Sequence, residues 1–363
     1  MSIRKALRKP DELGSLELFS ELDEDSDSRL ALNDSRRIDA VVSRFGQGLR
    51  TALDIPARVH GWRTQGMFPA VVLALGGIRL LTAEDAGSYY FDDAYGPAKA
   101  PDFRVITARG EHLLVEVRNV GPAYTLKKRT MSEAEFQGAQ RYADWTGARL
   151  MIAHYWAGPN LWTLVDSRAL TPFGGTMRLT LEEALPANEF GMLGDAWVGT
   201  TPPLVLSLVA DPAQPRTVDD QPGASHASFV IGGLEISCRG RRLEADLERR
   251  IAWSLMAFGG WHAEENVEVD DDGKVVQLSY RFEPAEPVEA PQGFEIVGPL
   301  SSLYSALYNL MTLDEDGEVT SLRRSAKPGI LRDLIPDDYW DDPDRALPLW
   351  RLNLHPREAA EAG

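Results

Sequence analysis

The spacing of hydrophobic residues divides the first part of the chain into helical and extended segments. From Ser35 to Leu53, apolar side chains recur every three or four positions, which predicts an amphipathic helix. A second helix is expected over Gln65–Leu75, because the glycine pair that follows supplies a stop signal. The apolar run Ile78–Thr82 predicts a short strand. The ordered part of the chain therefore begins with two helices and a strand.

After residue 100 the hydrophobic period changes from helical spacing to alternation. Phe103–Thr107 and His112–Val120 are predicted as two strands of a hairpin that turns at Gly110. Within the second strand, Glu116 and Arg118 point to one face, and the alternate residues make the other face fully apolar. A charged pair is therefore expected on a sheet whose opposite face is buried.

A capped helix and two apolar strands follow this hairpin. Ser132 and Glu135 form a capping box that begins a helix ending near Thr146. The apolar runs Arg149–Trp156 and Leu161–Val165 are predicted as strands. The order helix, strand, strand, strand, helix, strand, strand predicts a mixed α/β sandwich.

A proline-rich stretch from about residue 186 to residue 225 separates this region from the rest. The elements predicted beyond residue 185 are a strand over Leu204–Val209, a hairpin over Ser228–Cys238 that turns at Gly232-Gly233, a helix over Leu243–Phe258, a hairpin that turns at Asp271-Asp272-Gly273, and a helix over Ser301–Thr312. The predicted organisation is an acidic, poorly ordered tail (1–35), an α/β domain (36–185), an α+β domain of unknown role (186–356) and a polar tail (357–363).

Composition limits the classes of protein that this chain can represent. Of its 363 residues, 44% are hydrophobic, so a sizeable core is available. Acidic residues outnumber Lys and Arg by 55 to 38, and the net charge is −17. That is the wrong sign for a protein whose whole surface binds nucleic acid, so any such site must be a local basic patch. A single cysteine, Cys238, excludes an internal disulfide, and no Cys/His spacing indicates a zinc site.

Targeting signals are not expected in this sequence. Its first residues lack the apolar segment of a signal peptide. The most apolar stretch, Met67–Leu81, is too short to span a bilayer and contains Pro69 and Arg79. We therefore expect a cytoplasmic protein without a membrane partner.

One segment of the acidic chain is basic. Between Ala98 and Asn160 there are nine Lys and Arg residues and six Asp and Glu residues, which gives this segment a net charge of +3. Its peak is Lys127-Lys128-Arg129. A basic island of this kind favours contact with a polyanion.

The sequence Pro101–Asn119, PDFRVITARGEHLLVEVRN, resembles the PD-(D/E)XK motif of restriction enzymes, junction resolvases and repair nucleases. Asp102 stands at the beginning of one strand and Glu116 lies on the next, followed two positions later by a cation. The resemblance extends over about Gln65–Trp162 and implies a restriction-endonuclease-like fold, in which helices flank a mixed sheet. It implies a metal-dependent nuclease that acts on DNA or RNA.

The resemblance also implies roles for individual residues. Asp102 and Glu116 would hold Mg²⁺ or Mn²⁺, since hard divalent cations take oxygen ligands. Arg118 would stabilise phosphate charge, and Gln140 would orient water or substrate. The expected nucleic-acid contacts are Lys127, Lys128, Arg129, Arg141 and Tyr142. The C-terminal domain would supply recognition, or contacts in a homodimer or larger complex.

The chain departs from the family pattern at two positions. The family has Lys where this chain has Arg118, and an arginine side chain stays charged and does not act as a base. Lys127 or Lys128 is an alternative source of the missing lysine. The family's earlier helix often carries a Glu near the metal, and Pro69 stands at the corresponding place.

Two competing hypotheses follow from these departures. In the first, the chain is a catalytically degenerate nuclease fold that binds nucleic acid or serves as a structural subunit. In the second, the motif is fortuitous, and the carboxylates of Asp102 and Glu116 lie too far apart to share one cation.

Overall fold

The computed structural model describes residues 12–23, 30–84, 89–122, 129–221, 224–286 and 293–353. Its centre is a five-stranded sheet with the order β1-β2-β3-β5-β6. These strands are β1 (Ile78–Ala83), β2 (Phe103–Thr107), β3 (His112–Val120), β5 (Arg149–Trp156) and β6 (Leu161–Asp166). β3 and β5 are parallel, and the other neighbours are antiparallel, so the sheet is mixed.

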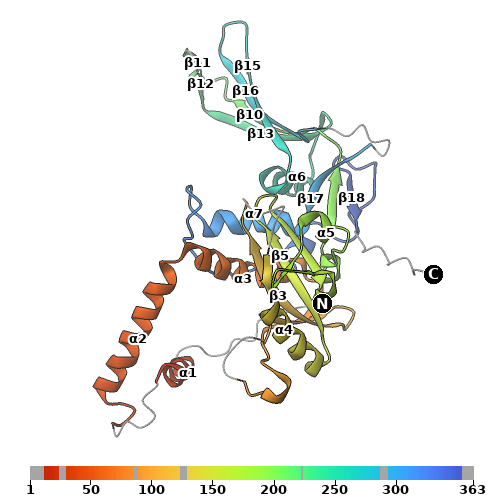
Figure 1. The fold of residues 1–363 in the computed structure, drawn as a ribbon. Helices are drawn as coiled ribbons and strands as arrows, with labels where there is room; N and C mark the ends of the chain where they lie inside the picture. Colours follow the sequence, from red (N-terminus) through yellow and green to blue (C-terminus); the bar gives the residue numbers. More distant parts are fainter. Residues whose placement is uncertain are drawn as a thin grey trace, which may run out of the picture.

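Two helices cover opposite faces of this sheet (Figure 1). Alternate residues of β3 face different helices: Val115 packs in the cluster that contains Phe68 of α3 (Pro56–Leu75). Leu114 packs in the cluster that contains Ala139 of α4 (Glu133–Thr146). The predicted order of helices and strands is present as α3, β1, β2, β3, α4, β5 and β6, with one unpredicted strand, β4 (Arg129–Ser132), between β3 and α4.

Local signals in the sequence explain where the two helices begin and end. Pro56 occupies the first turn of α3, where its missing N–H costs nothing, and Gly76 ends the helix in a left-handed conformation. The capping box predicted for α4 is present: Ser132 Oγ accepts from the backbone N–H of Glu135, and the Glu135 carboxylate accepts from the backbone N–H of Ser132. Because α3 begins at Pro56 and not near Gln65, it is longer than the apolar pattern predicted.

The described residues also form three smaller sheets and one further five-stranded sheet. The small sheets are β4-β8-β7, with β4 (Arg129–Ser132), β7 (Thr171–Phe173) and β8 (Thr176–Arg178); β17-β9-β18, with β9 (Trp197–Thr200), β17 (Glu295–Pro299) and β18 (Leu349–Leu352); and β11-β12, with β11 (Arg216–Gln221) and β12 (Ala224–Phe229). The second five-stranded sheet has the order β14-β13-β10-β16-β15, with β10 (Leu204–Ala210), β13 (Ile231–Cys238), β14 (Arg241–Arg242), β15 (His262–Val269) and β16 (Val275–Glu283).

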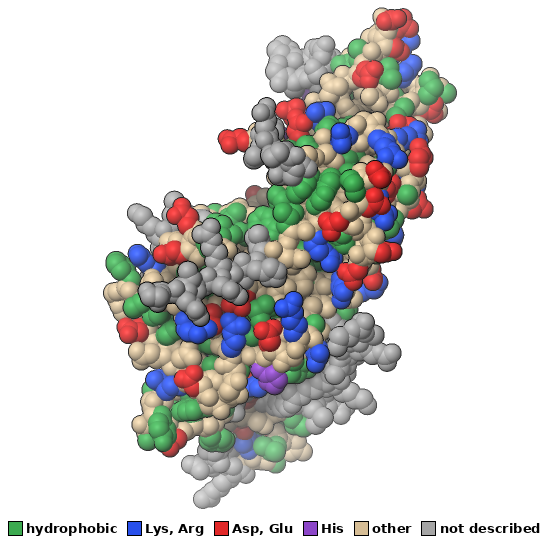
Figure 2. Space-filling view, turned by 90° about the vertical axis from the view of Figure 1, so that its right-hand side faces the viewer, with side chains coloured by type: hydrophobic (Ala, Val, Ile, Leu, Met, Phe, Trp, Pro, Cys, Tyr) green, Lys and Arg blue, Asp and Glu red, His purple; other side chains and the backbone are tan. Residues whose placement is uncertain are grey.

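The second five-stranded sheet projects from the body of the molecule together with β11 and β12 (Figure 1). Figure 2 shows acidic and basic side chains interspersed along this projection, with hydrophobic side chains gathered where it meets the body. The predicted hairpin at Gly232-Gly233 is wrong, because β12 pairs with β11 and β13 pairs with β10. Both glycines lie inside β13. The predicted turn at Asp271-Asp272-Gly273 does connect β15 to β16.

The main hydrophobic core crosses the predicted domain boundary at residue 185. It contains residues of α3 and the central sheet, and also residues of α6 (Asp246–Phe258) and α7 (Leu300–Thr312). Trp162 of β6 is fully buried, and its indole N–H donates to Ser305 Oγ of α7 at 2.9 Å. The two predicted domains therefore share one core. The short helix α5 (Leu181–Ala184) follows β6 in the chain, and the short helix α8 (Ile330–Leu334) follows α7.

Two helices precede the α/β body. The predicted helix after residue 35 is confirmed as α2 (Ser35–Leu53), which begins with Asp34 as N-cap and projects away from the sheet (Figure 1). Its apolar stripe is exposed, at Ile38, Val42, Phe45, Leu49 and Leu53. The structure also has a helix, α1 (Glu12–Leu22), inside the range for which we expect a poorly ordered tail. No helix in the described residues is long and apolar enough to cross a membrane.

Replacement of Trp162 by alanine should strongly destabilise the fold. The Trp162 ring packs against Phe68, Tyr155 and Phe190, and removal of a buried aromatic side chain typically costs about 3–5 kcal/mol. Urea denaturation followed by circular dichroism should show this loss. The matched control is Trp145→Ala, which removes a half-exposed ring and should change the free energy of unfolding far less. Equal losses in the two variants would show that α7 is not held through this contact.

Candidate functional site

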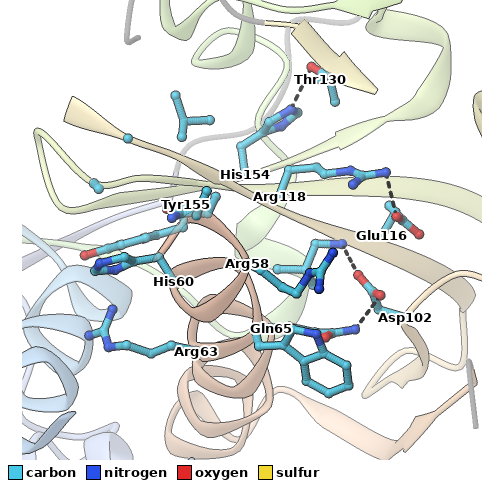
Figure 3. A pocket seen from close by; sticks show the side chains of 18 of the residues that line it. Arg58, His60, Arg63, Gln65, Asp102, Glu116, Arg118, Thr130, His154 and Tyr155 are labelled. Atoms are coloured by element: carbon cyan, nitrogen blue, oxygen red, sulfur yellow. Dashed lines mark hydrogen bonds and ion pairs between the residues drawn. The ribbon is translucent and has the colours of Figure 1, made fainter. Parts of the chain in front are cut away.

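A cavity of about 830 Å³ opens beside the edge of the central sheet where β2 begins. Its walls come from the first half of α3, the residues before β2, the second half of β3, and β5 and α7. Figure 3 shows the labelled side chains around it, with Asp102 and Glu116 on one side. The cavity therefore brings together side chains that are up to about 250 residues apart in the chain, as the Arg63–Thr312 bond shows.

Antiparallel pairing of β2 and β3 brings the two predicted carboxylates together. Phe103 is paired with Val115, so Asp102 stands opposite Glu116 one step further along. Asp102 Oδ2 accepts from the backbone N–H of Val117 at 2.7 Å, and Oδ1 accepts from the amide of Gln65 (Figure 3). Both acids line the cavity, as the motif predicts.

The electrostatic environment of the site raises the pKa of Asp102. Burial and the negative charge of Glu116 raise the pKa of Asp102 to about 7, although the Val117 N–H and the charges of Arg118 and Lys99 oppose this shift. Glu116 is 2% exposed and lies beside two cations. Asp102 is thus poised to gain or lose a proton near neutral pH.

Two cations converge on one oxygen of Glu116. Lys99 Nζ lies 2.7 Å from Oε1 and Arg118 Nη2 lies 2.8 Å from the same atom. Both cations also approach Glu135 Oε1, at 3.8 and 3.7 Å. Burial raises the pKa of Glu135, but the hydrogen bonds from Ser132 and the charges of Arg118 and Lys99 outweigh this effect and lower it. The result is a cluster of three carboxylates and two cations.

Arg118 keeps donor capacity that its ion pair does not use. Its Nε and Nη2 atoms are buried and make no hydrogen bond of good geometry with any described residue, although Nη2 is close to Glu116. A guanidinium group with unused donors at the wall of a cavity can bind an oxyanion. The geometry therefore fits the phosphate-stabilising role expected for Arg118.

Lys99 and Gln65 belong to this site, and our sequence reasoning missed both. Lys99 lies three residues before the motif aspartate, and its backbone N–H donates to the carbonyl of Gly138 on α4 at 3.1 Å. This close approach favours glycine at position 138, because a Cβ atom there would lie 3.2 Å from the Cβ of Lys99. Gln65 lies one helical turn before Pro69, where the resemblance implies an acid. The sequence signal for Lys99 is weak: it is a lysine near the motif and outside any predicted element.

Three predicted site residues on α4 lie outside the cavity lining. The amide of Gln140 donates to Asp144 and accepts from Ser167, so it is turned away from the carboxylate pair. The Arg141 guanidinium donates to the carbonyl of Pro97 at 2.6 and 3.0 Å. These contacts occupy the polar groups that the family resemblance and the basic segment led us to expect at the substrate.

The remaining α4 candidate is held by an acid on the opposite edge of the sheet. The Tyr142 hydroxyl donates to Glu84 Oε1 at 2.6 Å, and burial and this contact raise its pKa to about 12. Lys127 and Lys128 lie outside the described residues, and Arg129 begins β4, although its side chain is not described. The basic contacts expected from these three residues stay a prediction.

The side chains present allow a divalent cation of limited coordination. Asp102 and Glu116 line one cavity, and Glu116 Oε2 is buried with no hydrogen-bond partner among the described residues. Magnesium binds through one or two carboxylates and keeps several waters. In the described part of the chain, no cluster of three or more His, Cys, Asp or Glu residues is arranged to hold a metal. The site therefore fits one Mg²⁺ or Mn²⁺ held by two carboxylates and water.

Comparisons with known proteins find no matching family model and no matching curated protein. Among solved structures, the chain is similar to Hjc, a Holliday junction resolvase from the archaeal hyperthermophile Archaeoglobus fulgidus. The match has a TM-score of 0.28 and 16% sequence identity, and it covers 35% of this chain and 94% of the resolvase. The resolvase is thus a distant structural neighbour of part of the chain, and no activity follows from it. The protein has a mixed α/β fold in which a pair of acidic residues, Asp102 and Glu116, lines a cavity.

The raised pKa of Asp102 should make the stability of the fold depend on pH. The unfolded carboxyl has a pKa near 4 and the folded one a pKa of about 7, so the unfolded state releases its proton first as pH rises. The free energy of unfolding should consequently fall between about pH 4 and pH 7. Urea denaturation across this window should show a larger fall in the wild type than in Asp102→Asn, because Asp195, whose pKa burial raises to about 6, contributes equally in both proteins. Parallel curves for the two proteins would contradict the raised pKa.

Proposed function

We propose that this chain is a metal-dependent nuclease that hydrolyses phosphodiester bonds in DNA, with RNA as the second substrate to test. One observation carries the proposal: two carboxylates from adjacent strands share a cavity with a lysine and an arginine. Phosphodiester hydrolysis needs groups that hold a cation, groups that bind the phosphate, and a group that accepts a proton. The cavity contains a candidate for each.

Each residue of the cluster has a distinct proposed role. Asp102 and Glu116 hold Mg²⁺ or Mn²⁺, which would supply charge stabilisation to the phosphate and to the attacking water. Arg118 donates to the phosphate through its unused N–H groups. Lys99, which contacts Glu116, takes the place of the lysine that the family carries where this chain has Arg118.

Substrate contact is proposed for the basic island between Ala98 and Asn160. Its net charge is +3 in a chain of net charge −17, so a polyanion would be attracted to this segment and repelled elsewhere. Lys127, Lys128 and Arg129 follow the strand that carries Glu116, and they remain the proposed backbone contacts. Arg141 and Tyr142 are less suited, because their polar groups already bond to Pro97 and Glu84.

A second candidate function is nucleic-acid binding without cleavage. It is favoured by the state of the carboxylates: both oxygens of Asp102 accept hydrogen bonds, and two cations already neutralise Glu116. A cluster compensated in this way is complete without a divalent ion. The two candidates differ in whether Asp102 and Glu116 bind metal.

Asp102→Ala and Glu116→Ala should each abolish cleavage of DNA in Mg²⁺ or Mn²⁺, with a loss of roughly 10²-fold or more in rate, since each removes a metal ligand. The assay offers single-stranded, double-stranded and branched DNA, together with RNA. Glu133→Ala, which removes an exposed carboxylate from the first turn of α4, is the matched control and should leave cleavage unchanged. Calorimetric titration with Mn²⁺ reports metal binding directly. If the wild-type protein binds the substrates but does not bind Mn²⁺ and does not cleave, the second candidate function is established.

The contact between Lys99 and Glu116 predicts that Lys99 is required for cleavage. Lys99→Met should reduce kcat about 10²-fold, because it removes a positioned cation, while Lys99→Arg should retain part of the activity. Arg104→Met, which breaks an ion pair with Glu84 away from the cavity lining, serves as the control. Unchanged kcat in Lys99→Met would remove Lys99 from the mechanism.

A further inference from the structure

Arg63 is a buried arginine whose hydrogen-bond partners are all neutral. It lies on the first half of α3, and its side chain is 3% exposed. Its Nε donates to Thr312 Oγ1 at 2.8 Å, and its Nη2 donates to Asn309 Oδ1. The guanidinium also lies over the ring of Tyr308, 5.6 Å from the centroid. Two residues of α7 and one aromatic face therefore fix its position.

The charge of Arg63 is not compensated by any acid in the described part of the chain. No described Asp or Glu forms an ion pair with it, and its third nitrogen, Nη1, makes no hydrogen bond to a described residue. Burial lowers its pKa, yet an arginine in a protein stays protonated. A buried charge without a counter-charge is costly, and proteins generally pair such groups. The arrangement is that of a cationic site prepared for an anion from outside.

The same cavity connects Arg63 to the carboxylate pair. Arg58 and His60 on α3 and Tyr155 on β5 also line it. In Figure 3, Arg63, His60 and Tyr155 lie to the left of α3, while Asp102 and Glu116 lie to its right. The cavity thus has one end that holds the carboxylate pair with Lys99 and Arg118, and another end that holds Arg63. An extended polyanion could occupy both ends at once.

Neutral contacts around Arg63 keep its donors oriented. Asn309 uses its carbonyl for Arg63 and donates its amide to the hydroxyl of Tyr155 at 3.0 Å. Tyr155 donates in turn to Asn160 Oδ1 at 2.9 Å, and Asn160 is tied to Ser302 of α7. Asn309 and Thr312 are therefore positioning residues. The region after residue 185 contributes a wall to the cavity through them.

We infer that Arg63 binds a second phosphate group of the nucleic-acid substrate, distinct from the phosphate at Asp102 and Glu116. This inference rests on the proposed nuclease function and deepens it, because it assigns one end of the cavity to the substrate strand. Phosphate is the anion that suits a planar guanidinium with unused donors, since its oxygens accept paired hydrogen bonds. Arg58, on the same helix, lines the cavity and adds a further cation. The bound phosphate can be a strand end or an internal diester.

The test measures equilibrium binding of a fluorescent single-stranded DNA oligonucleotide in Ca²⁺, at several salt concentrations. Arg63→Met should weaken binding about tenfold and reduce the dependence of binding on salt by roughly one phosphate contact. The matched control is Arg345→Met, which removes an arginine that lies over the ring of Tyr339 outside the cavity lining, so it should bind nearly as the wild type does. Binding and salt dependence that do not change in Arg63→Met would overturn the inference.

Two forms of the oligonucleotide separate the sources of the phosphate. If Arg63 holds a strand end, the wild type should prefer a 5′-phosphorylated strand to a 5′-hydroxyl strand, and Arg63→Met should lose that preference. If Arg63 holds an internal diester, both strands should bind equally to the wild type and equally less to the variant. Either pattern supports a phosphate site at Arg63.

If Arg63→Met does not fold, the phosphate contact can be measured on the wild-type protein. Single phosphates of the oligonucleotide are replaced in turn by neutral methylphosphonates. One position should weaken binding about tenfold, and the effect should diminish in Arg63→Lys, which keeps charge but loses the planar fork. No sensitive position would overturn the inference. Failure of the nuclease proposal is a different result: Asp102→Ala and Glu116→Ala would then leave cleavage unaffected, whatever Arg63 does.

Discussion

The arrangement of the whole site depends on the burial of one carboxylate in the middle of a sheet. Glu116 is 2% exposed on a strand whose other face is apolar, and a buried charge of this kind requires compensation. Lys99 and Arg118 provide it through a single oxygen. This requirement constrains the residues before β2. Lys99 reaches Glu116 from a backbone position that is hydrogen-bonded to, and closely packed against, Gly138 of α4. The fold and the chemistry are thus set by the same contact.

The cavity joins parts of the chain that the sequence suggested were independent. The end with Asp102 and Glu116 belongs to the α/β sheet. The end with Arg63 is bounded by α7, which lies more than a hundred residues beyond β6. The buried bond between Trp162 and Ser305 keeps these parts in register. In the proposed function, chemistry and substrate positioning are therefore divided between two regions that share one hydrophobic core.

Local patterns predicted the α/β elements well, and they failed where contacts are distant in sequence. Alternation in β3 correctly placed Glu116 on the face opposite the apolar residues, and the capping box of α4 was visible in Ser132 and Glu135. Lys99 was missed because its contact depends on a loop folding back onto α4. Gln140 was expected at the site from the family resemblance, yet its amide is bonded to Ser167 and Asp144. The false hairpin arose in the same way, since glycine pairs indicate turns but do not select strand partners.

The position of α3 has a consequence for sequence change among homologues. Ten of its residues are buried, and it carries Gln65 beside Asp102 and Arg63 beside α7. One inserted or deleted residue would rotate the rest of the helix by about 100°, and Gln65 and Arg63 would then leave their partners together. The projecting sheet and α2 carry no such constraint. Divergence in this lineage should consequently accumulate in length and shape at the periphery, while α3 changes only by substitution.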